Sequence, residues 1–239
     1  FPAEHRRNRR ALRDRNLVPD RELRQVVQLR LVQPFALHGH QRDRQARRLP
    51  GPRYDSVVDQ REGFVDAGVH LHRAFGFQDP ERMDPFLLFD DFRNENPRDY
   101  LRGFPWHPHR GIETITYVLA GAVEHGDSLG NRGTLKGGDV QWMTAGSGIL
   151  HQEMPLGNAK GQMHGFQLWA NLPSQLKMTA PRYQDVKSRD IPEIMDDDGT
   201  IVKVIVGSFW GKTGPVDGIA ADPQYLDIYV PPEKKKTFK

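Results

Sequence analysis

Two pairs of candidate metal ligands constrain this chain most, because the members of each pair are two residues apart. The first pair is His107 and His109, and the second pair is His151 and Glu153. Residues i and i+2 of an extended chain point to the same face, so both pairs need β-strands to aim their side chains at one point. If two strands bring the pairs together, three imidazoles and one carboxylate can surround a metal ion. This donor set suits iron, manganese, cobalt, nickel, copper or zinc better than magnesium or calcium, which prefer oxygen ligands.

Short runs rich in apolar and β-branched residues, separated by turn residues, recur from residue 63 onward. The sequence predicts strands over residues 69–75, 84–92, 112–119, 139–144, 149–154, 164–172, 201–207 and 225–230. Segment 94–108 is polar and rich in proline and glycine, which predicts a loop leading to the first histidine pair, and segment 130–138 predicts turns. No long amphipathic helix is evident after residue 61. Many short strands between turns favour an all-β sandwich or barrel.

A few other residues are weaker candidates for the site. If one unbroken strand runs on from the first histidine pair, Glu113 shares its face and could bind the metal or orient a ligand. Gly111 could introduce a bulge that reverses this parity. His70 and His72 form another i, i+2 pair, but no third donor lies near them in the sequence, so we expect surface or edge positions. His164 opens a predicted strand, where a structural role or contact with a ligand is expected.

Charge is distributed unevenly along the chain. Residues 1–60 contain fourteen arginines, no lysine and seven acidic residues, whereas the remainder has 20 basic and 24 acidic residues. Arginine without lysine indicates biased composition more than a phosphate-binding surface, so we expect a disordered or non-native extension that does not bind nucleic acid directly. A basic arm that touches a polyanion is the alternative. Within the extension, residues 23–37 could form a transient helix.

Composition also excludes several kinds of protein. The chain has no cysteine, so it can form neither a disulfide framework nor a thiolate metal site. No apolar run is long enough for a membrane span, and the start lacks the apolar region of a secretory signal. We therefore expect a soluble, cytoplasmic protein.

Four sequence blocks, in this order, resemble the pirin family of the cupin superfamily. They cover residues 84–92, 107–114, 138–155 and 164–173. The resemblance implies a double-stranded β-helix barrel, which is jelly-roll-like, with a metal held by His107, His109, His151 and Glu153. The implied metal is Fe(II), and the family pattern takes its carboxylate from the second motif, which favours Glu153 over Glu113.

Pirin-like proteins are similar to one another in having two cupin domains, with the metal in the first. On this pattern residues 1–60 form an extension, residues 61–183 form the metal-binding cupin domain, and residues 184–239 form a linker and the start of a second cupin domain. Most of that second barrel is expected to be absent from this sequence.

The resemblance implies an oxidoreductase of the quercetin 2,3-dioxygenase type, which opens a flavonol ring with dioxygen. In this reading Glu153 accepts the proton of the substrate hydroxyl if it is only loosely bound to the metal. Phe104 and Trp106 precede the first ligands and could form an aromatic wall for a planar substrate or bury ordinary core surface. The alternative function is an iron-binding, redox-sensitive regulator that binds transcription factors or other proteins. A third possibility is a metal-stabilised barrel that acts on another small molecule.

Overall fold

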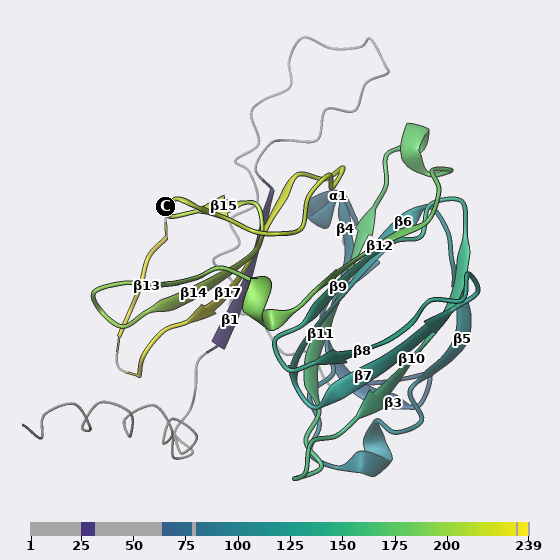
Figure 1. Ribbon diagram of the computed structural model, residues 1–239, viewed down its shortest axis with the longest axis horizontal. Helices are drawn as coiled ribbons and strands as arrows, with labels where there is room; N and C mark the ends of the chain where they lie inside the picture. The colour runs from purple at the N-terminus through teal and green to yellow at the C-terminus, as the bar shows by residue number, and fades with distance from the viewer. Residues whose placement is uncertain (1–24, 32–63, 78–79, 233, 239) are drawn as a thin grey trace, which may run out of the picture.

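The structure, a computed structural model, describes residues 25–31, 64–77, 80–232 and 234–238. Most of the described chain forms strands in two sheets that face each other (Figure 1). The first sheet has the order β5-β10-β7-β8, with bounds β5 (Phe104–His109), β10 (Ile149–Leu156), β7 (Ala122–Asp127) and β8 (Arg132–Lys136). The second sheet has the order β12-β9-β6-β11-β4-β3-β2, with bounds β12 (Arg182–Val186), β9 (Val140–Thr144), β6 (Ile112–Ala120), β11 (His164–Asn171), β4 (Phe86–Asp91), β3 (Val69–Phe75) and β2 (Phe64–Asp66).

A third sheet lies beside this pair (Figure 1). Its order is β1-β17-β14-β13, with bounds β1 (Gln25–Leu31), β17 (Pro223–Tyr229), β14 (Ile201–Val206) and β13 (Glu193–Met195). A small hairpin joins β15 (Ser208–Phe209) to β16 (Lys212–Thr213). The helical segments are short: α1 (Pro80–Met83) and the 3-10 turns Pro97–Asp99, Ser174–Leu176 and Ser188–Asp190. In the part of the chain that the structure describes, no helix has both the length and the apolar character that crossing a bilayer requires.

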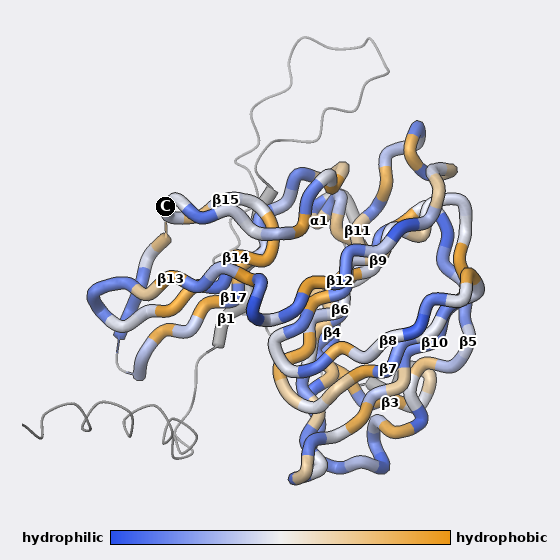
Figure 2. Tube along the Cα trace, in the orientation of Figure 1, coloured by the Kyte–Doolittle hydropathy of each residue, from blue (hydrophilic) through white to orange (hydrophobic). Residues whose placement is uncertain are grey.

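The second sheet is buried on both faces, which explains its long apolar strands. Ile115, Tyr117 and Leu168 lie on one face and pack with Ile205 and Tyr225 in one core cluster that joins this sheet to the third sheet. Figure 2 shows apolar stretches recurring along the strands on both sides of this contact. Each such side chain contributes about 1.5–3 kcal/mol when fully buried. Thr116, one residue along from Tyr117, therefore points to the opposite face, toward the first sheet.

The all-β fold is confirmed, as two facing sheets of a β-sandwich, and each of the eight predicted strands is present. Besides β1 and β5, seven strands were not predicted. They are β2, β7, β8 within the predicted turn segment 130–138, β12, β13, β15 and β16. The predicted loop 94–108 was wrong at its end, because β5 already begins at Phe104 and pairs with β10. An edge strand of mixed proline and histidine has little β-propensity of its own, so only its pairing defines it.

The N-terminal extension is described only at β1. There the helix prediction for residues 23–37 was wrong, because Gln25–Leu31 forms a strand antiparallel to β17. Tertiary pairing with an existing strand overrides a weak local helix preference. The rest of residues 1–60 lies outside the described residues, and the three-part division at residues 60 and 183 stays a prediction.

Candidate metal centre

Three of the four predicted ligands lie together between the two facing sheets. His107 and His109 are on β5, and His151 is opposite His107 in the β5–β10 register. The candidate ligand atoms of the three side chains all lie within 4.8 Å of one another. Their ring centroids are 4.4 Å apart for His107 and His151, and 4.8 Å apart for the other two pairs. The i, i+2 spacing on β5 therefore does bring both imidazoles to one face.

The hydrogen bonds of His107 indicate which nitrogen is free to bind a metal. Its Nδ1 lies 2.7 Å from the carbonyl oxygen of Pro105, a contact in which Nδ1–H donates. In the neutral ring this leaves a lone pair on Nε2, which lies 3.0 Å from Nε2 of His109. Two nitrogens bound at right angles to one metal, each at about 2.1 Å, would be about 3.0 Å apart. The spacing of these two imidazoles thus fits neighbouring positions around a transition metal.

Burial keeps the imidazoles of His109 and His151 neutral, as metal ligation requires. Burial, followed by the charges of His151 and His107, lowers the pKa of His109 to about 3. Burial, followed by the charges of His107 and His125, lowers the pKa of His151 to about 3. Neither ring nitrogen of His151 finds a hydrogen-bond partner among the described residues, although the side chain is 1% exposed. A buried imidazole with both nitrogens unpaired fits a ligand position.

Glu153 is beside the three histidines but is not one of their group. It lies two residues after His151 on β10 and is buried. It is close enough to His109 for its negative charge to oppose part of the lowering of the His109 pKa. Its Oε1 accepts a hydrogen bond from Thr116 Oγ1 at 2.6 Å, and its Oε2 accepts one from Gln167 Nε2 at 3.1 Å. The Thr116 hydroxyl also lies 2.7 Å from Gln167 Oε1, so two acceptors share its one proton. The carboxylate is thus held by β6 and β11.

Glu113 does not belong to this site. It is buried on the other face of β6, where its Oε1 accepts a hydrogen bond from Thr144 Oγ1 at 2.7 Å. Glu113 was expected to share a face with the first histidine pair only if one unbroken strand carried them. Gly111, with φ +70°, instead separates β5 from β6, and the two strands belong to different sheets. Burial raises the pKa of Glu113. The carboxylate therefore lies in the interior on the side of the sheet away from the histidines.

The other histidines considered in the sequence lie elsewhere. His70 is exposed, 4.0 Å from a carboxylate oxygen of Asp99. His72 is opposite Asp91 in the β3–β4 register, and His164 lies 3.7 Å from the same carboxylate. These positions agree with the expected edge and structural roles.

Sequence reasoning missed His125. This residue is on β7, 6% exposed, and its ring centroid is 5.6 Å from that of His151. It is directly opposite Glu153 in the β10–β7 register, so it points to the same interior face. His125 and Asp127 do have the i, i+2 spacing, a signal that the sequence reasoning did not use. In the structure the Asp127 carboxylate accepts hydrogen bonds from Asn131 in a turn.

Aromatic side chains line part of the centre. Trp169 packs against His109 with ring centroids 4.9 Å apart. Phe104 packs against a separate core cluster that includes Tyr100 and Met163, which agrees with the core alternative for this residue. Trp106 is 51% exposed.

Comparison with known proteins agrees with this geometry. The family model for pirin matches residues 68–170. A pirin-like protein of Caulobacter vibrioides is 49% identical over 166 residues, which cover 69% of this chain and 60% of that protein. Human pirin is 43% identical over 179 residues, covering 74% of this chain and 59% of pirin. A crystal structure of quercetin 2,3-dioxygenase from Acinetobacter baumannii is 36% identical, with a TM-score of 0.59, and the match covers 66% of this chain and 58% of that one.

The chain thus spans about three fifths of the length of these curated relatives. The matched region contains the three clustered histidines, Glu153 and the strands that carry them. Residues 68–170 therefore form a pirin-family domain.

Proposed function

We propose that the chain binds one divalent transition metal, most fittingly Fe(II), through His107, His109 and His151, with Glu153 as fourth donor. The observation that carries the proposal is the convergence of three imidazoles whose ligand atoms lie within 4.8 Å of one another. The same donors suit Mn, Co, Ni, Cu or Zn, so the choice of iron comes from the family.

We propose further that the site carries out a quercetin 2,3-dioxygenase-type reaction on a flavonol and dioxygen. The name of the similar Acinetobacter protein supports this substrate class. When bound, the metal would supply Lewis acidity and redox chemistry. Three neutral imidazoles and one carboxylate leave a divalent ion with net positive charge, which favours a deprotonated substrate hydroxyl.

Glu153 would accept the proton of that hydroxyl. It is the carboxylate beside the imidazoles, and the Thr116 and Gln167 donors fix its position. Trp169, packed against His109, would keep water from one side of the centre. These residues form the rigid support that a reaction site needs, because they lie on paired strands rather than loops.

The regulatory alternative, an iron-binding protein that contacts transcription factors or other proteins, stays a prediction, as does the cytoplasmic location. Capture of a DNA-binding partner by the oxidised but not the reduced iron form would support it.

The test combines metal analysis with oxygen uptake. The full chain, loaded with Fe(II), should consume dioxygen and release ring-cleavage product when quercetin is added. His151→Ala should lose bound metal and activity together, whereas His70→Ala, an exposed histidine far from the centre, should keep both. Full metal occupancy in His151→Ala would refute the site, and a fully loaded wild type without oxygen uptake would refute the reaction.

A further inference from the structure

A small cavity opens where the edges of the two facing sheets meet. Strand β8 is the last strand of the first sheet and β12 is the first strand of the second. Between them lies a cavity of ≈ 140 Å³, and its wall consists of His125, Asn131, Arg132, Gly133, Gln141, Tyr183 and Asp185. The three clustered histidines are not part of this wall. The ring of His125 therefore has the cavity on one side and His151, at 5.6 Å, as another neighbour.

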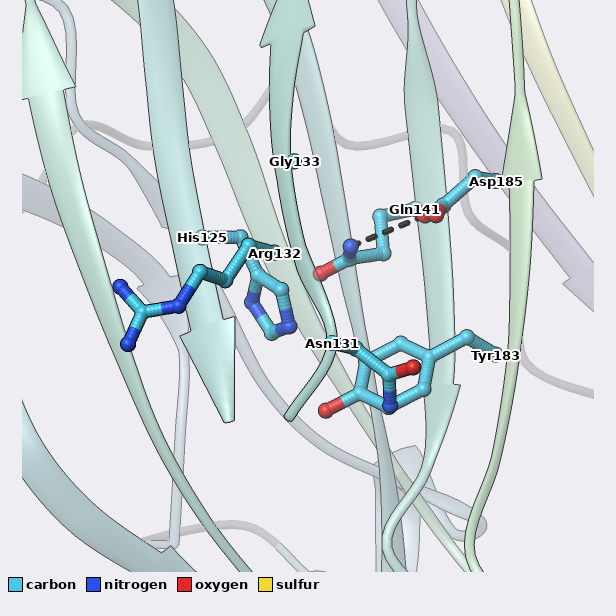
Figure 3. A pocket seen from close by; sticks show the side chains of 7 residues that line it. All are labelled: His125, Asn131, Arg132, Gly133, Gln141, Tyr183 and Asp185. Carbon is cyan, nitrogen blue, oxygen red and sulfur yellow. Dashed lines mark hydrogen bonds between the residues drawn. The ribbon is translucent and has the colours of Figure 1, made fainter. Parts of the chain in front are cut away.

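Two side chains in the wall carry buried polar atoms with unused hydrogen-bonding capacity. Both ring nitrogens of His125 make no hydrogen bond within the described part of the chain, and the Tyr183 hydroxyl, which donates to Asp127, keeps its oxygen free to accept. His125 is 6% exposed, and its ring centroid lies 5.1 Å from that of Tyr183. Figure 3 shows His125, Gln141 and Tyr183 pointing toward a common space, with the Arg132 guanidinium directed away. Buried polar groups are nearly always paired, so these face something that occupies the cavity.

The charges of the wall disfavour an ionic occupant. Asp185 lines the cavity, and its carboxylate already accepts a hydrogen bond from Gln141 Nε2 at 2.9 Å. Burial raises the pKa of nearby Asp127, but hydrogen bonds from Asn131 and Tyr183 keep that pKa below its usual value, so a second negative charge lies beside Tyr183. An anion would be repelled by these carboxylates, and a cation would have to compete with the Gln141 amide for Asp185 and with Asn131 and Tyr183 for Asp127.

A neutral hydroxyl group matches the available atoms. A neutral histidine ring offers one donor and one acceptor, and the oxygen of a tyrosine hydroxyl still accepts when its proton is donated elsewhere. A ligand hydroxyl both donates and accepts, so it can donate to the Tyr183 oxygen and accept from His125. The size fits a six-membered ring, since a cavity of about 150 Å³ holds one benzene molecule. The flat faces of His125 and Tyr183 suit an aromatic ring.

We propose that this cavity is a binding site for a hydroxylated aromatic ring, which His125 and Tyr183 recognise through its hydroxyl group. The site is separate from the metal centre and does not depend on the proposed reaction. Because His125 contacts His151, a ligand that holds the His125 ring in place also restrains the orientation of the His151 imidazole in the metal centre.

The experiment measures phenol binding to the full chain by calorimetry, with metal bound and again after chelation. Wild type should bind phenol at least ten times more tightly than benzene, and more tightly than cyclohexanol, in both states. Tyr183→Phe, which removes only the hydroxyl, should weaken phenol binding about tenfold and leave benzene binding unchanged. Tyr225→Phe, which removes a buried hydroxyl outside the cavity wall, should bind phenol as wild type does.

His125→Phe should likewise lose the preference for phenol over benzene. If His125→Phe does not fold, the result for Tyr183→Phe decides the question. Equal affinity for phenol and benzene in wild type, or an unchanged phenol affinity in Tyr183→Phe, would overturn the proposal. Cyclohexanol binding as tightly as phenol would overturn the aromatic assignment. No binding of any probe at millimolar concentration would indicate a cavity that holds only water. Failure of the oxygenase reaction leaves all these readouts unaffected.

Discussion

Two buried tyrosines between the second and third sheets form a natural test of how these sheets are held together. Tyr117 and Tyr225 are both 0% exposed, and their ring centroids are 6.3 Å apart. The Tyr117 hydroxyl donates a 2.6 Å hydrogen bond to Asp227 Oδ2 on β17. The Tyr225 hydroxyl has no hydrogen-bond partner in the described segments. The two side chains therefore share ring packing and differ in what their hydroxyls do.

We expect Tyr117→Phe to destabilise the protein and Tyr225→Phe to leave stability unchanged or raise it. A hydrogen bond to a charged group contributes about 1.5–3 kcal/mol, and this one is lost in Tyr117→Phe. For a chain of this size each kcal/mol lowers the melting temperature by about 2–4 °C, so the expected decrease is about 3–12 °C. Removing an unpaired buried hydroxyl instead removes a desolvation penalty.

Thermal and urea denaturation of the wild type and both variants, followed by circular dichroism, measures the two free energies of unfolding. The urea slope should be the same in all three proteins, so that the midpoints compare stabilities directly. Equal losses in both variants would refute the reasoning, because ring packing rather than the hydrogen bond would then account for the effect. A larger loss in Tyr225→Phe would contradict it more strongly.

One further prediction concerns the support of the metal centre, and another concerns the close approach of two backbone segments at Gly146. Thr116→Val removes a hydrogen-bond donor to Glu153, so Fe(II) affinity measured anaerobically should fall about 10–100-fold. The control Thr144→Val removes the matching donor to Glu113 on the opposite face of the sheet and should keep wild-type affinity. Equal losses of affinity in the two variants would argue against a role for Glu153. Gly146→Ala should lose about 1–3 kcal/mol more in urea denaturation than Gly130→Ala, because both glycines have positive φ but only a Cβ at 146 collides with the carbonyl oxygen of Thr179. Similar losses of stability in the two variants would mean that the positive φ, and not the collision with Thr179, accounts for the destabilisation.

Local sequence pattern was sufficient to predict the two strands that hold Glu153 through Thr116 and Gln167. Residues 112–119 and 164–172 are rich in β-branched and aromatic residues, and they form β6 and β11 with nearly the predicted bounds. The spacing of His107 and His109 predicted that both rings share a face, and they do. These features depend on strand geometry, which repeats every two residues whatever the rest of the chain does.

Pairing between strands decided what local pattern could not. Strand β5 and strand β1 have weak preferences of their own, and each is defined by the neighbour with which it pairs. Glu113 was separated from the histidines by a single turn at Gly111, which reversed the parity that an unbroken strand would have kept.

The sequence by itself determined the all-β class, the positions of eight strands, the family resemblance and three histidines that come together. Only the tertiary structure decided that Glu153 is held by Thr116 and Gln167, and that His125 and Tyr183 meet at a cavity between β8 and β12. The physical reason is the range of the interactions. Face and strand preference are set by neighbours along the chain, whereas partners separated by more than ten residues meet only when the sheets pack.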